Sequence, residues 1–145
     1  MLKAICKNDF KTVEKCVKED GFDINGIIDK QQKYNAMTLA CHLDNLEMVH
    51  FLDILGASLN ESKGINGTTP LMAATNRWNV RIVDYLIERG ADPYVKDAYG
   101  FTVTEKAKIK NLKTIHSMLT GYETTYRFTR TGSVQSPLYI NSKMK

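Results

Sequence analysis

Residues 65–97 read INGTTPLMAATNRWNVRIVDYLIERGADPYVKD, and this stretch contains the most regular pattern in the chain. Thr69 is a suitable helix cap, because its hydroxyl can accept a backbone N–H that lacks a partner inside the helix. Pro70 suits the first helical position, where no N–H is needed. A helix is therefore predicted to start at Pro70, and the small side chains of Ala73 and Ala74 would let a neighbouring helix approach closely.

A second helix follows within the same stretch. Ile82, Val83, Leu86 and Ile87 recur at helical spacing and form one apolar stripe. Gly90 comes directly after this stripe, where a residue with positive φ commonly ends a helix. The stretch therefore predicts two short helices joined by a turn.

The offsets of these residues resemble one complete ankyrin repeat. The resemblance rests on Gly67, on Thr69-Pro70-Leu71, on the two alanines, on the apolar stripe and on Gly90-Ala91-Asp92. It implies a solenoid of stacked helix pairs that binds other proteins.

The same pattern recurs along the chain. When the pattern of residues 65–97 is shifted backward by 34 positions, it matches a second repeat in which Asn35 replaces Thr69 as the cap. A forward shift of the pattern by 33 positions matches a weaker third repeat. A backward shift by 70 positions shows that the amino terminus begins inside a repeat. We therefore expect an all-α ankyrin-repeat solenoid of about four helix pairs with an extended C-terminal tail. The helices are predicted at residues 2–7 and 10–18, 36–43 and 46–54, 70–76 and 80–88, and 103–109 and 112–119.

The predicted domain covers residues 1–120, with its first and last units acting as caps that expose polar faces. Residues 121–145 lack an evident helical pattern and are predicted to be an extended or disordered tail that orders on a partner. Three of the four net positive charges lie in this tail. It also contains Tyr122, Tyr126, Arg127, Phe128, Arg130 and Tyr139, which are expected to act as anchors; the alternative is an inert, floppy tail.

The positions that vary in ankyrin repeats predict a binding surface made of turn tips and first helices. In this sequence the resemblance selects Gln32, Tyr34, His42, Asn66, Thr68, Asn76, Arg77, Tyr99 and Phe101. The alternative for each is an ordinary solvated rim residue.

Trp78 departs from the repeat pattern. The family usually has glycine between the two helices of a repeat, and the four equivalents here are Asn8, Asp44, Trp78 and Asn111. Asn and Asp tolerate positive φ, whereas Trp does so poorly, so Trp78 either occupies a distorted turn or has ordinary φ. It is a candidate binding hot spot, or else it folds over a neighbouring repeat.

No catalytic or metal-binding constellation is evident, so we expect no enzyme activity and no cofactor. Cys6, Cys16 and Cys41 show no CxxC spacing and are predicted to be core thiols in a reducing compartment. No apolar run is long enough to span a membrane. We expect a cytoplasmic protein-binding module that is monomeric by itself, and we do not expect nucleic acid as a partner.

A second resemblance concerns residues 9–57, including the run HLDNLEMVHFLDILGAS. This part is similar to the first ankyrin units of the ankyrin repeat and EF-hand family associated with cilia, although the chain has no EF-hand calcium loop. The resemblance implies a structural component of the cytoskeleton or cilium axoneme, with tubulin or axonemal proteins as partners. A regulatory adaptor or inhibitor is an equal alternative.

Overall fold

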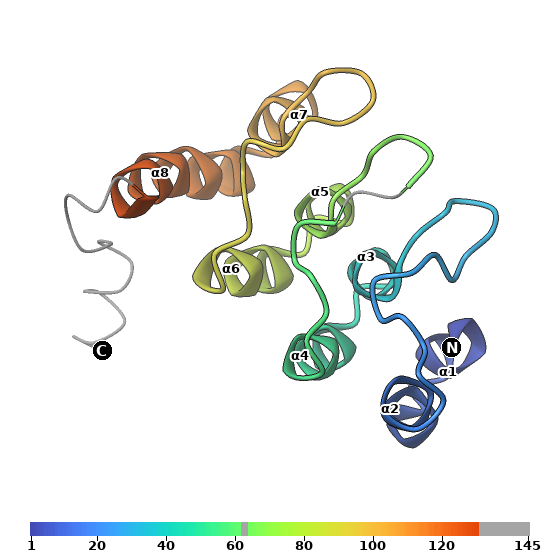
Figure 1. Ribbon diagram of the computed structural model, residues 1–145. Coiled ribbons are helices and arrows are strands. Elements are labelled where there is room, and N and C mark those ends of the chain that lie inside the picture. Colours follow the sequence, from blue (N-terminus) through green and yellow to red (C-terminus); the bar gives the residue numbers. More distant parts are fainter. Residues whose placement is uncertain (62–63, 131–145) are drawn as a thin grey trace.

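The computed structural model describes residues 1–61 and 64–130, which form four stacked helix pairs (Figure 1). The pairs are α1 (Leu2–Cys6) with α2 (Phe10–Lys18), α3 (Ala36–His42) with α4 (Leu46–Ile54), α5 (Pro70–Asn76) with α6 (Val80–Glu88), and α7 (Val103–Ile109) with α8 (Lys113–Arg130). The described residues contain no strand, only an isolated bridge between Ile27 and Asn35. The predicted all-α solenoid is thus confirmed.

The helices form two layers. The first helix of each pair (α1, α3, α5, α7) lies in an inner layer, and the second helix lies in an outer layer (Figure 1). The loops that precede α3, α5 and α7 project beside the inner layer. Each of these three inner helices begins at a side-chain cap: Asn35, Thr69 and Thr102 accept from backbone N–H groups three residues further on, at 2.9, 3.2 and 3.3 Å. The two predicted caps, Asn35 and Thr69, are confirmed.

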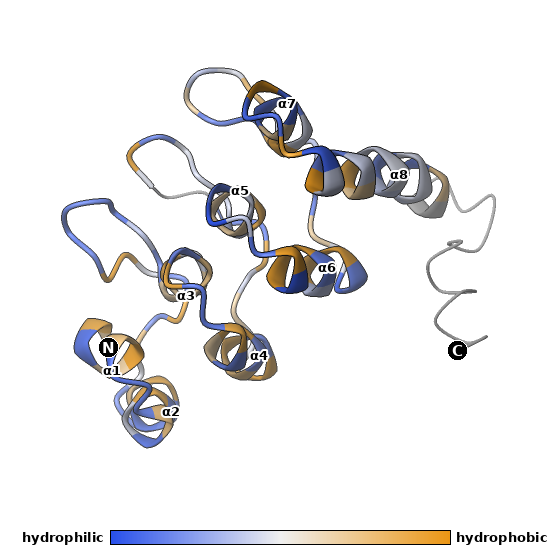
Figure 2. Cartoon of the chain, turned by 180° about the vertical axis from the view of Figure 1, so that it is seen from behind, coloured by the Kyte–Doolittle hydropathy of each residue, from blue (hydrophilic) through white to orange (hydrophobic). Residues whose placement is uncertain are grey.

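The core is densest in the middle of the stack. All residues from 36 to 41 in α3 and from 70 to 75 in α5 are buried. The small residues Ala40, Ala73 and Ala74 allow the two helices to pack closely. Burial falls at the amino end, where α1 buries Ala4 and Ile5 alone. Figure 2 shows mostly apolar residues on α4 and largely hydrophilic ones in the projecting loop before α3.

The outer helices α4 and α6 are joined by a polar cluster around Asp53. Arg89 donates to Asp53 from Nε at 2.7 Å, and the hydroxyl of Tyr85 also donates to this carboxylate. The ring of Tyr85 stacks on His50, with centroids 4.1 Å apart. Burial disfavours the Asp53 charge, but the hydrogen bonds from Arg89 and Tyr85 outweigh it and hold the pKa of Asp53 below its ordinary value. The cluster therefore favours the folded state when Asp53 is ionised.

The prediction of an extended tail is wrong for residues 121–130, which continue α8 to Arg130. Ile115, Leu119 and Tyr122 are buried on one side of this helix, at spacings of four and three residues. The Tyr122 hydroxyl donates to the Ala91 carbonyl oxygen at 2.5 Å. This packing outweighs the presence of Gly121 within the helix, which costs roughly 1 kcal/mol relative to Ala. Residues 131–145, including the predicted anchor Tyr139, lie outside the described residues.

Candidate functional site

The projecting loops form a row that we call the fingers: residues 25–34, residues 60–61 with 64–68, and residues 93–101. Backbone hydrogen bonds join neighbouring fingers. The N–H of Ile65 donates to the Gln32 carbonyl at 3.1 Å, and the N–H of Ala98 donates to the Asn66 carbonyl at 2.9 Å. The fingers are therefore held as one continuous surface.

Close approach between the second and third fingers depends on Gly67. Its φ of +66° lies in the left-handed region, and a Cβ built on it would be only 3.0 Å from the backbone nitrogen of Ala98. The equivalent positions, Lys33 and Gly100, also have positive φ. Gly67 is required both for its backbone conformation and for the space that it leaves.

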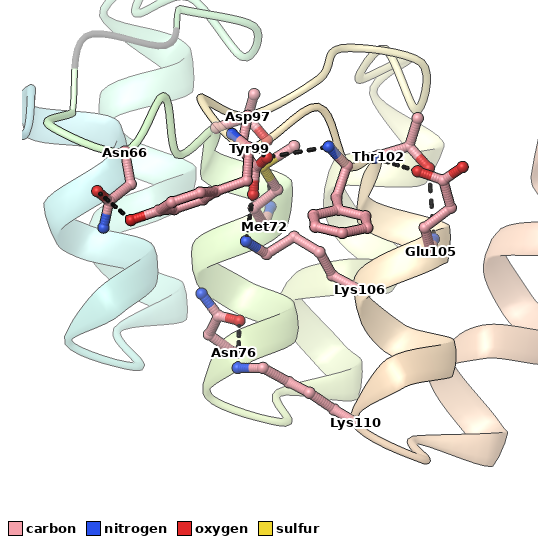
Figure 3. Close-up of polar contacts among 11 residues, drawn as sticks. Asn66, Met72, Asn76, Asp97, Tyr99, Thr102, Glu105, Lys106 and Lys110 are labelled. Carbon is pink, nitrogen blue, oxygen red and sulfur yellow. Dashed lines mark hydrogen bonds and ion pairs between the residues drawn. The ribbon is translucent and has the colours of Figure 1, made fainter.

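Asp97 organises the third finger from within. Its carboxylate accepts from the backbone N–H groups of Tyr99 and Phe101, at 3.0 Å each, and forms an ion pair with Lys106 from α7 (Figure 3). The Asp97 side chain is fully buried, with 0% of its surface exposed. Burial disfavours its charge, but Lys106 and the two N–H donors outweigh this effect and keep the pKa of Asp97 below its ordinary value. The finger tip is thus fixed by an internal charge.

Tyr99 lies on the outside of this fixed tip. Its side chain is 68% exposed, and its hydroxyl donates to Asn66 Oδ1 of the second finger at 3.4 Å. Below it, Lys110 at the end of α7 donates to Asn76 Oδ1 at the end of α5, at 2.7 Å (Figure 3). The structure thus places three predicted positions, Asn66, Asn76 and Tyr99, in contacts that cross from one repeat to the next.

The first finger contributes a second aromatic contact. The ring of Tyr34 lies 5.5 Å from the ring of His42 at the end of α3. Burial raises the pKa of Tyr34, with a smaller contribution from Asp29. A Cβ built on Gly64 would lie 3.2 Å from the Tyr34 ring, so the second finger packs closely on it. Gln32, His42, Arg77 and Phe101 are all exposed.

Two predicted binding residues are buried. Thr68 is buried at the end of the second finger, next to the start of α5, and Tyr122 is buried in the core. Their selection as accessible contact residues is therefore wrong in this fold. A repeat pattern gives the spacing of Thr68, but only packing decides whether its side chain faces outward.

Two further residues of α8, Tyr126 and Arg127, lie against Tyr94. The Tyr126 ring lies 6.1 Å from the Tyr94 ring and 5.6 Å from that of Tyr122, and Arg127 Nη2 lies 3.4 Å from the Tyr94 hydroxyl. Phe128 is exposed. Arg130 ends the helix. Tyr126 and Arg127 therefore contact the fold itself, where a partner had been expected.

Sequence reasoning missed Asp97 and Lys106, which fix the third finger. An acid followed by glycine three residues later, as in Asp97 and Gly100, is typical of a tight turn and could have indicated the first of them. Lys106 offered no such signal, because its ion pair forms only when α7 returns against the finger.

The cysteines and remaining polar groups show no reactive arrangement within the described residues. Cys41 is buried, and burial raises the pKa of its thiol. Cys16 is half-buried, whereas Cys6 is exposed, so its assignment to the core is wrong. No group of three His, Cys, Asp or Glu residues in the described chain could hold a metal ion.

Crossing a membrane takes a helix of about 20 mainly apolar residues. None of the helices within residues 1–61 and 64–130 is both long and apolar enough to cross a membrane.

Comparison with known proteins agrees with this geometry. The family model for ankyrin repeats (3 copies) matches residues 1–97 and 39–125. The chain belongs to the ankyrin-repeat family. The resemblance to the ciliary ankyrin and EF-hand family is not shown by these comparisons, which support the ankyrin repeats alone.

Several curated proteins contain similar ankyrin segments. Palmitoyltransferase AKR1 of Kluyveromyces lactis is 33% identical over 101 residues, which is 69% of this chain and 13% of that protein. BRCA1-associated RING domain protein 1 of Caenorhabditis elegans is 35% identical over 80 residues, covering 55% of this chain and 11% of that protein. A putative ankyrin repeat-containing protein of Treponema pallidum is 28% identical over 92 residues, covering 63% of this chain and 30% of that protein. This chain thus spans less than a third of each relative, and the likeness concerns repeats.

Proposed function

We propose that this chain is a non-catalytic protein-binding module that holds its partner against the fingers and the ends of the inner helices. We call this surface the finger face and define it by its exposed or half-buried residues: Gln32, Tyr34, His42, Asn66, Asn76, Arg77, Tyr99, Phe101 and Lys110. Ankyrin repeats as a family are protein-interaction modules.

The observation that carries the proposal is that Tyr99 is both exposed and held in a fixed position. Its ring is largely exposed, yet it stands on a finger fixed by Asp97 and is tied to Asn66. An aromatic side chain that is already ordered loses little conformational entropy on binding. Aromatic and arginine residues also supply a large share of binding energy in protein interfaces. Tyr99 and Arg77 are therefore the expected anchors.

Cross-linking in a native extract tests this assignment. Tyr99→Ala combined with Arg77→Ala should remove the principal cross-linked partner, while the circular dichroism spectrum stays helical. Lys15→Ala on α2 is the matched control, because Lys15 is exposed on the outer layer and should leave the partner in place. An unchanged set of partners in the double variant would contradict the finger-face proposal.

The partner could be regulatory or architectural. We favour a cytoplasmic adaptor or inhibitor, because Tyr122 and Tyr126, two of the tail anchors on which the axonemal alternative relied, pack within the fold. The alternative is a structural component of a microtubule or axonemal assembly. Its remaining candidate anchors are Phe128, which is exposed near the end of α8, and residues 131–145.

Co-sedimentation with assembled microtubules or isolated axonemes separates the two. Deletion must start at residue 131, because residues 121–130 belong to α8. The adaptor proposal expects no sedimentation of the intact chain. Sedimentation that is lost on deletion of residues 131–145 would support the architectural alternative instead.

A further inference from the structure

A second candidate surface lies at the corners, the turns that join the two helices of each pair. Asn8, Asp44, Trp78 and Asn111 occupy these corners, and all four have left-handed φ between 57° and 61°. Asn and Asp adopt this conformation readily, but a bulky side chain does so at a cost. Trp78 is nonetheless 70% exposed, so burial within its own chain offers little compensation. An exposed, strained tryptophan points to a contact outside the fold.

A groove of about 620 Å³ lies along the same edge, over the corners of the first two repeats. Its lining is mixed. Leu43, which is 41% exposed, and Leu46 are apolar, and the polar or charged lining residues are Asn8, Asp44, Asn45, Glu47 and Arg81. Trp78 lies at the next corner along this edge: the residue after it, Asn79, donates a hydrogen bond to Asp44 in the groove lining, and Arg81 of the same repeat also lines the groove. A groove with a polar and apolar lining and an exposed aromatic side chain therefore lie at neighbouring corners of the same edge.

The charges along this edge change sign between the second and third repeats. Asp44 and Glu47 lie at the second corner, and Arg77 and Arg81 lie at the third. Glu47, Arg77 and Arg81 make no ion pair with another described residue. The edge thus carries two acids beside two bases, with apolar residues on both sides of the boundary.

We propose that a second copy of this chain docks on the corner edge, with Trp78 of each copy entering the groove of the other. A two-fold axis between the second and third corners places the acidic second corner of each copy opposite the basic third corner of the other copy. The symmetric dimer therefore contains two such contacts. Lys7 and Lys110 would face each other at the ends and oppose association, so the dimer is weak. This differs from the monomer expected from sequence. The corner edge shares Arg77 and Lys110 with the finger face, but Glu47, Trp78 and Arg81, which the variants below change, lie outside that face.

Sedimentation equilibrium of the full chain tests the proposal. The weight-average mass should rise from 16.4 kDa toward twice that value as the concentration goes from micromolar to millimolar. Trp78 is the single tryptophan, so its fluorescence emission should shift to shorter wavelength over the same range. A monomeric mass and a fixed emission maximum at all concentrations would overturn the proposal, leaving the finger-face proposal intact.

Three variants test the arrangement. Trp78→Asn should abolish the dimer without lowering the melting temperature, because Asn suits the left-handed corner. Glu47→Arg and Arg81→Glu should each be monomeric alone, since each places like charges opposite each other. Mixed together, these two variants should associate, because every opposing pair is then of opposite charge. A mixture that stays monomeric, or a Trp78→Asn dimer of unchanged affinity, would contradict the two-fold arrangement.

Discussion

The side-chain amide of Asn79 donates a hydrogen bond to the carboxylate of Asp44 in the preceding repeat, while its Oδ1 caps α6 by accepting from the N–H of Ile82 at 2.9 Å. Asn45 does the same one repeat earlier, bonding Asn8 and capping α4. A single side chain thus begins one helix and ties it to the preceding repeat.

Separating these two roles at residue 79 gives the first prediction. Asn79→Asp keeps a capping oxygen but places a second carboxylate beside Asp44, so it should lower the free energy of unfolding by about 1 kcal/mol. Asn79→Ser keeps the cap and adds no charge, so it should lower the free energy of unfolding by less. Urea denaturation measures both. Added salt should narrow the difference between the two variants, and equal losses of unfolding free energy would show that repulsion from Asp44 contributes nothing.

Substitution of Trp78 should stabilise the isolated chain. Trp78→Asn gives this corner the residue present at two of the other corners, and relief of the left-handed backbone should add roughly 0.5–1 kcal/mol to the free energy of unfolding. Trp78→Ala is the control, because alanine keeps the unfavourable backbone and should bring no such gain. Thermal denaturation of dilute protein measures the change. A large loss of stability with Asn would mean that the indole packs on its own chain.

The buried Asp97 should make stability depend on acidic pH. Its pKa in the folded state lies below the ordinary value of 3.8, so its contribution is complete above that value and is lost as pH falls through the folded pKa. Asp97→Asn should cost about 2 kcal/mol near neutral pH, because it removes the charge that Lys106 and two N–H groups contact. The variant should also show a shallower loss of stability between about pH 5 and about pH 2.

Urea titrations at a series of pH values measure this difference. Asp53→Asn serves as a comparison, because Asp53 also has a lowered pKa but lies in the outer layer, away from the fingers. Parallel pH profiles for the wild type and the Asp97→Asn variant would contradict the role assigned to Asp97.

The second half of α8 should contribute to the stability of the fold. Tyr122→Phe removes the hydroxyl that donates to Ala91 and leaves a buried carbonyl without this donor, which should cost about 1 kcal/mol. Tyr122→Ala also leaves a cavity and should cost about 3–5 kcal/mol. Thr124→Ala, at an exposed position of the same helix, should stay within about 0.5 kcal/mol of the wild type. Chemical denaturation followed by circular dichroism measures all three.

The repeat pattern predicted most of the helix boundaries because its signals are local. The α5 helix begins at Pro70 after its Thr69 cap and ends at Asn76, as expected from a hydroxyl cap followed by proline. The sequence repeat also predicted that residues 8, 44, 78 and 111 occupy equivalent corners, and all four have left-handed φ. These features depend on residues within a few positions of one another.

The end of α8 was missed although a signal was present. Ile115, Leu119, Tyr122 and Tyr126 are spaced as one helical stripe, but Gly121 and several threonines obscured it. What holds Tyr122 in this helix is the carbonyl of Ala91, 31 positions earlier. No local pattern contains that partner.

The sequence by itself therefore determined the repeat, its helices, its caps and the corner at Trp78, because these follow from backbone preferences and short-range periodicity. Only the stacking of the repeats leaves Tyr99 exposed on a finger fixed by Asp97 and Lys106, buries Thr68 and Tyr122, and joins Asn79 to Asp44 beside the exposed Trp78. Those outcomes depend on which side chains meet when repeats stack, and stacking joins residues roughly 33 positions apart, as in the bonds of Asn79 to Asp44 and Tyr99 to Asn66.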